Sequence, residues 1–210
     1  MKKSLLLWLF LLTIISGQDF DNLDFVKDRI ANYYEQGQYD LEVRQIIDSA
    51  LLQLENISAA GKQAVVFDID ETALSNYSHI KSVGFGYIPS LWDSWIREEK
   101  AVKIEPVFLL YKKAVEKGLK VLFITGRNDS QYEPTFRNLT AEGYSTFDTL
   151  ITKPMNHNYQ SAAEFKADKR RELSAKGYTF VMCVGDQFSD CEIENYGIRV
   201  KLPNYLYFVK

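Results

Sequence analysis

The chain has 210 residues, 46% hydrophobic and 25% charged, which is enough length and apolar content for one domain with a sizeable core and a small insertion. Its formal net charge of −3 argues against a protein held to nucleic acid by bulk positive charge, since such binding requires a basic patch. We therefore expect no nucleic-acid polymer among its partners.

The first 17 residues have the pattern of a secretory signal peptide. Lys2 and Lys3 precede an apolar run over residues 5–15, and the small residues Ser16 and Gly17 follow it. The run is too short for a comfortable membrane span. We expect cleavage after Gly17, with an uncleaved anchor as the alternative. The mature protein would then be secreted or periplasmic, with no stable membrane anchor.

After the leader, the pattern changes from helices to alternating strands and helices. Residues 19–61 show helical periodicity, with one expected helix over 22–34 and another that includes 43–54. From residue 64 onward, short apolar runs predict strands and longer segments predict helices. The expected strands are 64–67, 120–125, 147–151, 179–184 and 198–202, and the expected helices between them are 106–118, 132–142 and 162–176. This alternation predicts an α/β fold, a Rossmann-like doubly wound parallel sheet.

Residues 75–105 interrupt the alternation. The segment follows the first strand and is too long for an ordinary strand-to-helix loop. We expect a small, mainly helical cap inserted there, within one domain over residues 18–210. Its aromatic rings either pack within the cap, which is the simpler interpretation, or stack on a substrate. These rings are Tyr77, Phe85, Tyr87, Trp92 and Trp95.

Two carboxylates, Asp68 and Asp70, follow the first predicted strand. Residues two apart in a strand project from the same face, and two acids on one face resist burial unless a cation or a shared proton compensates. Because open α/β sheets bind ligands at the carboxyl ends of their strands, the pair is a candidate site. The alternative is that residues 68–72 open a helix, with one acid as its cap and the other on the surface.

Other polar groups are expected at the same edge of the sheet. The tripeptide Thr-Gly-Arg at 125–127 ends the second strand with a hydroxyl and a glycine N–H that can approach an anion. Asp186 and Asp190 follow the strand over 179–184, and Lys166 lies early on the helix before that strand. Each feature alone reads equally well as a turn, a loop or a solvated helix face. Their order at successive strand ends makes the set specific.

These residues resemble the four ordered motifs of the haloacid dehalogenase (HAD) superfamily of phosphotransferases. Residues 68–72 resemble its first motif, 125–127 its second, Lys166 its third and 185–190 its fourth. Finer similarity connects residues 63–210 to the acid phosphatase branch, subfamily IIIB, with the bacterial class B and class C acid phosphatases and the plant vegetative storage proteins. The segments that carry it are 67–76, 84–86, 165–166, 185–187 and 201–204.

The resemblance implies an acid phosphatase that hydrolyses small phosphomonoesters, nucleoside monophosphates among them, through an aspartyl-phosphate. Asp68 would be the nucleophile, and Asp70 would donate a proton to the leaving oxygen and then activate water. Thr125, Gly126 and Lys166 would hold the phosphoryl oxygens. Transfer of the phosphoryl group to an alcohol, or a non-catalytic ligand-binding or storage protein, are the alternatives, and the intact motifs disfavour the storage protein.

A divalent metal ion, Mg²⁺, is part of what the resemblance implies, since hard cations prefer oxygen ligands. The expected ligands are the Asp68 carboxylate, the Asp70 backbone carbonyl and the Asp186 carboxylate, with Asp190 acting through water or as a neighbouring acid. The family is also compatible with a homodimer, although no interface signature is evident in the sequence.

The cysteines and histidines carry less information. Cys183 and Cys191 flank the fourth motif, and a bridge is allowed in an exported protein. Because Cys183 lies in an apolar strand, we expect two free, buried thiols. Neither His79 nor His157 lies in a strand-end motif, so a histidine nucleophile is not expected, and only His79 in the cap is a candidate for contact with substrate.

Overall fold

The computed structural model describes residues 21–156, 158–192 and 196–209. The expected signal peptide, residues 1–17, and His157 lie outside these ranges. Within them, no helix has the combination of length and apolar character that is needed to cross a membrane.

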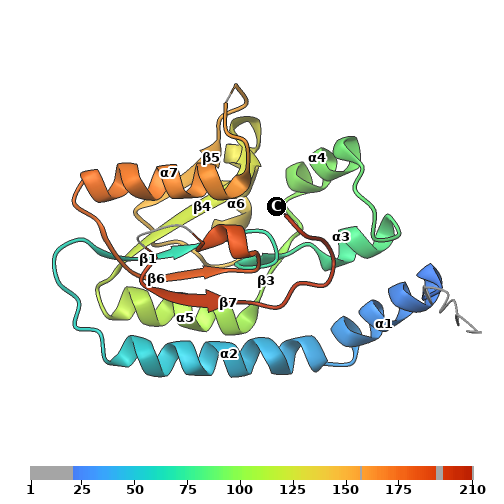
Figure 1. Cartoon of the computed structure of the whole chain (residues 1–210), viewed down its shortest axis with the longest axis horizontal. Helices are drawn as coiled ribbons and strands as arrows, with labels where there is room; N and C mark the ends of the chain where they lie inside the picture. The colour runs from blue at the N-terminus through green and yellow to red at the C-terminus, as the bar shows by residue number, and fades with distance from the viewer. Residues whose placement is uncertain (1–20, 157, 193–195, 210) are drawn as a thin grey trace, which may run out of the picture.

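A five-stranded parallel sheet forms the centre of the molecule (Figure 1). Its strand order is β5-β4-β1-β6-β7. The strands are β1 (Gln63–Phe67), β4 (Lys120–Asn128), β5 (Thr149–Lys153), β6 (Thr179–Gly185) and β7 (Ile198–Lys201). The chain proceeds from β1 to one side through β4 and β5, then crosses to the other side for β6 and β7. The point where the order reverses therefore lies at the carboxyl ends of β1 and β6, which is where open α/β sheets bind ligands.

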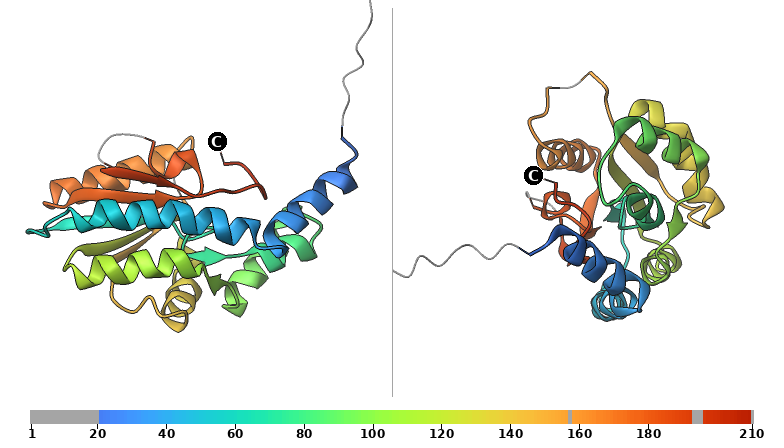
Figure 2. Two further views of the ribbon diagram at one scale, coloured as in Figure 1. Left: turned by 90° about the horizontal axis from the view of Figure 1, so that it is seen from below. Right: turned by 90° about the vertical axis from the view of Figure 1, so that its right-hand side faces the viewer.

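Helices cover both faces of the sheet, as a doubly wound fold requires (Figure 2). α2 (Gln38–Glu55), α5 (Glu105–Glu116) and α6 (Tyr132–Ala141) contribute to the core on one face. α7 (Ala162–Ala175) covers the other face. The predicted fold class is thus confirmed.

The burial of the central strand β1 explains why its apolar run predicted a strand clearly. Val65 and Phe67 pack with the residues of α2 and α5, whereas Ala64 and Val66 pack with those of α7. All four are buried, so both faces of the strand must be apolar and the run is continuous rather than alternating.

A mainly helical cap follows the first strand of the sheet. β2 (Leu74–Ser75) pairs antiparallel with β3 (Val102–Lys103), and α3 (Tyr77–Ser82) and α4 (Pro89–Glu98) lie between them. In Figure 1 these two helices stand beyond the end of the sheet, above the N-terminal helix α1 (Leu23–Glu35). The cap therefore faces the carboxyl ends of the strands.

The expected helices and strands of the core form, with shifts of a few residues at their ends. The largest difference is in β4, which was expected to end at Thr125 and continues to Asn128. Its pairing with β5 shifts register between Ile124 and Asn128, so the Thr-Gly-Arg tripeptide forms the irregular end of the strand. A single turn of 3₁₀ helix follows at Asp129–Gln131.

Cys183 and Cys191 form a disulfide, so the expectation of free thiols is wrong. Their Cα atoms are 5.9 Å apart, within the range that a bridge requires. The apolar surroundings of Cys183 predict that it is buried but not that it is bonded to another cysteine. The bridge forms because the turn after β6 brings Cys191 back beside Cys183. The bridge closes the loop that carries Asp186 and Asp190.

Removing the bridge should destabilise the protein. For two cysteines eight residues apart, loop-closure entropy predicts a loss of about 2–3 kcal/mol in the free energy of unfolding. Urea denaturation of a Cys183→Ser/Cys191→Ser double variant measures this loss. A reductant should lower the wild-type midpoint to that of the variant and leave the variant unchanged, whereas equal sensitivity of both proteins to the reductant would contradict the bridge.

Candidate active site

Asp68 follows β1 directly, at the point where the strand order reverses. Its backbone N–H donates to the carbonyl of Val184 on β6 at 2.9 Å, which extends the sheet by one residue. The residue is 7% exposed, and its Oδ1 accepts a hydrogen bond from Lys166 Nζ at 2.6 Å. No described residue donates to Oδ2. One carboxylate oxygen is therefore held, and the other is available to a ligand.

Asp68, Asp186 and Asp190 form a buried cluster in which one oxygen from each lies within 4.8 Å of the others. Lys166 Nζ also donates to Asp190 Oδ1 at 2.6 Å. Burial raises the pKa of Asp68 well above its usual value, against the opposing effect of Lys166, and burial together with Asp190 raises the pKa of Asp186 to about 7. With all four groups ionised, three carboxylates and one ammonium leave a net charge of −2. A divalent cation would neutralise that charge.

Hydrogen bonds hold the carboxylates of the β6 loop in place. Thr72 Oγ1 donates to Asp186 Oδ1 at 3.1 Å, and Asn204 Nδ2 donates to Asp186 Oδ2 at 2.7 Å. Gln187 Nε2 donates to the same Oδ2 at 2.6 Å, while the Gln187 backbone N–H donates to Asp190 Oδ2 at 2.8 Å. These donors come from the loops after β1, β6 and β7, so the sheet topology builds the cluster.

Asp70 is held by a second set of contacts. Arg127 Nη2 donates to Asp70 Oδ1 at 2.6 Å, and Arg127 Nε lies within 3.2 Å of both carboxylate oxygens. Asn76 Nδ2 adds a hydrogen bond to Oδ1 at 2.9 Å. Sequence reasoning placed Arg127 only within a motif and missed it as the partner of Asp70. Its position two residues after Thr125, on the same face at the strand end, was the available signal.

The structure places Thr125 and Gly126 at the same edge, at the end of β4. Thr125 is buried, and its Oγ1 accepts a hydrogen bond from the Arg127 N–H at 3.1 Å. Gly126 is exposed between two buried neighbours and lines a cavity beside Asp70. All the residues predicted for the site therefore come together at the carboxyl end of the sheet.

Glu71 is a buried acid that sequence reasoning did not single out. Its backbone has a φ of +54°, which is unusual for a residue with a side chain. Its carboxylate accepts hydrogen bonds from the Asn76 N–H at 2.6 Å and from Tyr207 Oη at 2.7 Å. Burial raises the pKa of Glu71 to about 7, and the neighbouring Asp70 adds to the shift. Glu71 thus ties the loop after β1 to the C-terminal segment.

A cavity of about 670 Å³ opens beside Asp70, between the end of the sheet and the cap. Two of the five cap aromatics do not line it. Tyr77 stacks on Tyr34 with ring centroids 4.7 Å apart, and the Trp95 indole N–H donates to Asn76 Oδ1 at 2.8 Å. His79 does line the cavity. The aromatic walls of the cavity are Phe85, Tyr87 and Trp92 from the cap and Tyr207 and Phe208 from the C-terminal segment.

A doubly wound sheet with buried carboxylates and a buried lysine at its carboxyl edge, under an inserted cap, is the arrangement expected of a HAD-type protein. The chain belongs to the HAD superfamily, subfamily IIIB, the acid phosphatases, whose family model matches residues 19–210. The resemblance inferred from the motifs is confirmed, and the family is one of phosphomonoesterases.

Individual relatives agree with this placement. The chain is 31% identical to the stem 28 kDa glycoprotein of Glycine max over 184 residues, 85% of this chain and 72% of that protein. It is 26% identical to acid phosphatase 1 of Solanum lycopersicum over 188 residues, 87% of this chain and 74% of that protein. Its fold resembles the class C acid phosphatase from Bacillus anthracis with a TM-score of 0.73 at 24% identity, over 89% of this chain and 86% of that one.

Proposed function

We propose that the chain is an acid phosphatase that hydrolyses small phosphomonoesters, with Asp68 as its nucleophile. The observation that carries the proposal is Asp68 itself: Lys166 holds Oδ1, and Oδ2 accepts no hydrogen bond from a described residue. In the first step Oδ2 bonds to phosphorus as the bond to the leaving oxygen breaks, which gives an aspartyl-phosphate. In the second step water attacks phosphorus, inorganic phosphate leaves and the carboxylate is restored.

Asp70 carries the protons in this proposal. It donates a proton to the leaving oxygen in the first step and takes one from the attacking water in the second. Asp70 must therefore start the first step in its protonated form. Arg127 and Asn76 fix the direction of its carboxyl group through the contacts described above.

Replacing Arg127 with Lys should lower kcat/KM by about 10–100-fold. Lysine keeps the positive charge but cannot make the bidentate hydrogen bonds that orient Asp70. Rates with an aryl phosphate, measured for wild type and variant at the same pH values, test this. Arg137→Lys is the matched control, since Arg137 pairs with Glu99 on the surface. A wild-type profile for Arg127→Lys would contradict the positioning role.

Three groups are proposed to bind the phosphoryl oxygens: Thr125, the Gly126 N–H and Lys166. Negative charge spreads over these oxygens in the transition state, where donors and cations that are already in place stabilise it. The raised pKa of Lys166 supports its part, because Asp190 and Asp68 outweigh the lowering effect of burial and keep the ammonium charged.

The carboxylate cluster fits a hard divalent cation, which we propose is Mg²⁺. The donor set is all oxygen, and the net charge of −2 matches one such ion. The Asp68 and Asp186 carboxylates and the Asp70 backbone carbonyl would hold it. Asp190, which accepts hydrogen bonds from Lys166 and a backbone N–H, would act through water or as a neighbouring acid. When bound, the cation would neutralise charge and polarise a phosphate oxygen.

We propose nucleoside monophosphates as one substrate class, supported by the aromatic walls of the cavity. Stacking of a base on such a ring is worth about 1–3 kcal/mol. Trp92→Ala should therefore lower kcat/KM for AMP by about fivefold or more and leave a sugar phosphate nearly unaffected. Equal losses of kcat/KM on AMP and on the sugar phosphate would remove the stacking role.

A substrate panel that includes an alcohol acceptor separates hydrolysis from phosphotransfer. Failure to turn over any phosphomonoester in the panel would favour the alternative of a storage protein.

We also propose that the chain is exported. The leader-like pattern of residues 1–17 and the disulfide, which persists in oxidising compartments, support this. Sequencing the N-terminus of the protein from the extracellular or periplasmic fraction tests the cleavage after Gly17. A homodimer is compatible with the family, and sedimentation would test whether the chain forms one.

A further inference from the structure

The cations near the site differ in whether they have a partner. Arg127 is committed to Asp70, and Lys166 is committed to Asp68 and a second carboxylate. Lys153 also lines the cavity, yet its side chain makes no hydrogen bond or ion pair with any other described residue. The residue is half-buried in the cavity wall. An ammonium group that has no partner in such a wall can form a charge-assisted hydrogen bond with an anion.

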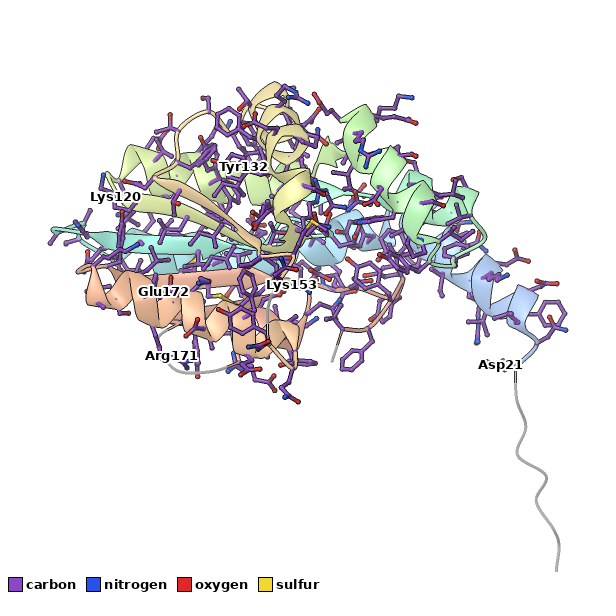
Figure 3. The ribbon with its side chains drawn as sticks, turned by 90° about the horizontal axis from the view of Figure 1, so that it is seen from above. Asp21, Lys120, Tyr132, Lys153, Arg171 and Glu172 are labelled. Carbon is purple, nitrogen blue, oxygen red and sulfur yellow. A yellow bond between two sulfur atoms is a disulfide. The ribbon has the colours of Figure 1, made fainter. Side chains whose placement is uncertain are left out.

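The fold places Lys153 on the wall of the cavity that faces the cap. It is the last residue of β5 and pairs in register with Asn128 at the end of β4, which lines the same cavity. Figure 3 shows Lys153 between the core and the cap, whereas Lys120 lies at the opposite end of the sheet. The backbone position is thus fixed by strand pairing.

The carboxylates that line the cavity do not supply the missing anion. Asp70 is paired with Arg127, and Asp93 accepts a hydrogen bond from Gln131 Nε2 at 2.6 Å. Neither forms an ion pair with Lys153. Among the described residues, then, none provides a counter-charge for Lys153, and a molecule that enters the cavity can provide one.

The strand order decides which part of a substrate Lys153 can reach. β5 is separated from β1 by β4, so the carboxyl ends of β5 and β1 are two strand spacings, about 10 Å, apart. Asp68, Lys166 and the Thr-Gly-Arg turn surround the place proposed for the reacting phosphorus. A group bound at Lys153 then lies on the leaving-group side of the substrate, beyond the scissile bond.

We propose that Lys153 binds a second anionic group, a carboxylate or a phosphate, on the leaving-group part of the substrate. The inference rests on the proposed phosphatase function and narrows its substrate class to phosphomonoesters that carry further negative charge. The anion at Lys153 is not transferred, so Lys153 acts on specificity and takes no part in the bond changes.

The test compares 4-carboxyphenyl phosphate with phenyl phosphate, and adenosine 3′,5′-bisphosphate with AMP. Lys153→Met should lower kcat/KM for 4-carboxyphenyl phosphate and for adenosine 3′,5′-bisphosphate, the substrates with a second anionic group, by about 10–100-fold. The change should be mainly in KM, as expected for the loss of one charged hydrogen bond. Its rates on phenyl phosphate and AMP should stay within about threefold of wild type. Lys153→Arg should retain the preference. Lys120→Met, which removes the same charge from the far end of the sheet, should leave all four rates unchanged.

The two pairs separate the sources of the anion: a loss in the carboxylate pair alone or in the phosphate pair alone identifies which group Lys153 takes. Equal losses on all four substrates, or an unchanged preference, would overturn the inference. Phenylphosphonate and 4-carboxyphenylphosphonate cannot be hydrolysed. Their equilibrium binding therefore tests the anion subsite at Lys153 separately from the proposed phosphatase function. If wild type turns over no ester but prefers the carboxylated phosphonate, and Lys153→Met removes that preference, the subsite stands and the phosphatase proposal fails.

Discussion

Asp68→Asn should abolish hydrolysis of an aryl phosphate, with a loss in kcat of at least about 10⁴-fold, while the protein remains folded. An amide is not a nucleophile toward phosphorus, so no aspartyl-phosphate forms. The amide oxygen can still accept the hydrogen bond from Lys166. The substitution also removes one carboxylate from a crowded buried cluster, so we expect the metal-free melting temperature to stay the same or rise.

The measurement pairs steady-state rates with circular dichroism and thermal melting. Asp48→Asn, on the exposed face of α2, is the matched control and should retain full activity. Mass spectrometry of acid-quenched enzyme should detect a phosphoryl adduct on the wild-type peptide that contains Asp68 and none on the variant. Activity of Asp68→Asn near the wild-type level would end the assignment of the nucleophile.

The fold was predictable because its central strands are buried on both faces and its helices end at clear signals. Residues 64–67 of β1 are all apolar, and the turn after α5 contains Gly118 with a φ of +74°, a conformation that glycine adopts readily. The site was predictable for a related reason. Parallel strands bring their carboxyl ends to one edge, so residues far apart in sequence, such as Asp68 and Asp186, could be placed together from strand order alone.

The parts that sequence reasoning missed depend on contacts that strand order does not determine. Asn76 and Tyr207 meet at Glu71 because a cap residue and a C-terminal residue both reach the loop after β1. Which of the cap aromatics line the cavity likewise depends on the orientation of the two short helices α3 and α4. Nothing in the spacing of Cys183 and Cys191 separates a buried thiol pair from a bridge.

Removing divalent metal should abolish activity, and Mg²⁺ should restore it and stabilise the fold. Three buried carboxylates with one lysine are short of positive charge, so an ion that binds the folded state alone raises the free energy of unfolding. At one hundred times the dissociation constant the gain is about 2.7 kcal/mol, or about 5–10 °C in melting temperature for a chain of this size. Thermal melting after chelation and then after addition of Mg²⁺ measures it.

The stabilisation should depend on pH in a defined direction. Since burial raises the pKa of Asp186 to about 7, the metal-free folded state binds more protons than the unfolded chain between about pH 4 and pH 7. Its free energy of unfolding therefore falls as the pH rises through that window. Mg²⁺ competes with those protons, so its stabilising effect should be larger above pH 7 than near pH 5. Asp186→Asn should remove most of the effect and Asp48→Asn none. An equal gain in Asp186→Asn would place the cation outside this cluster.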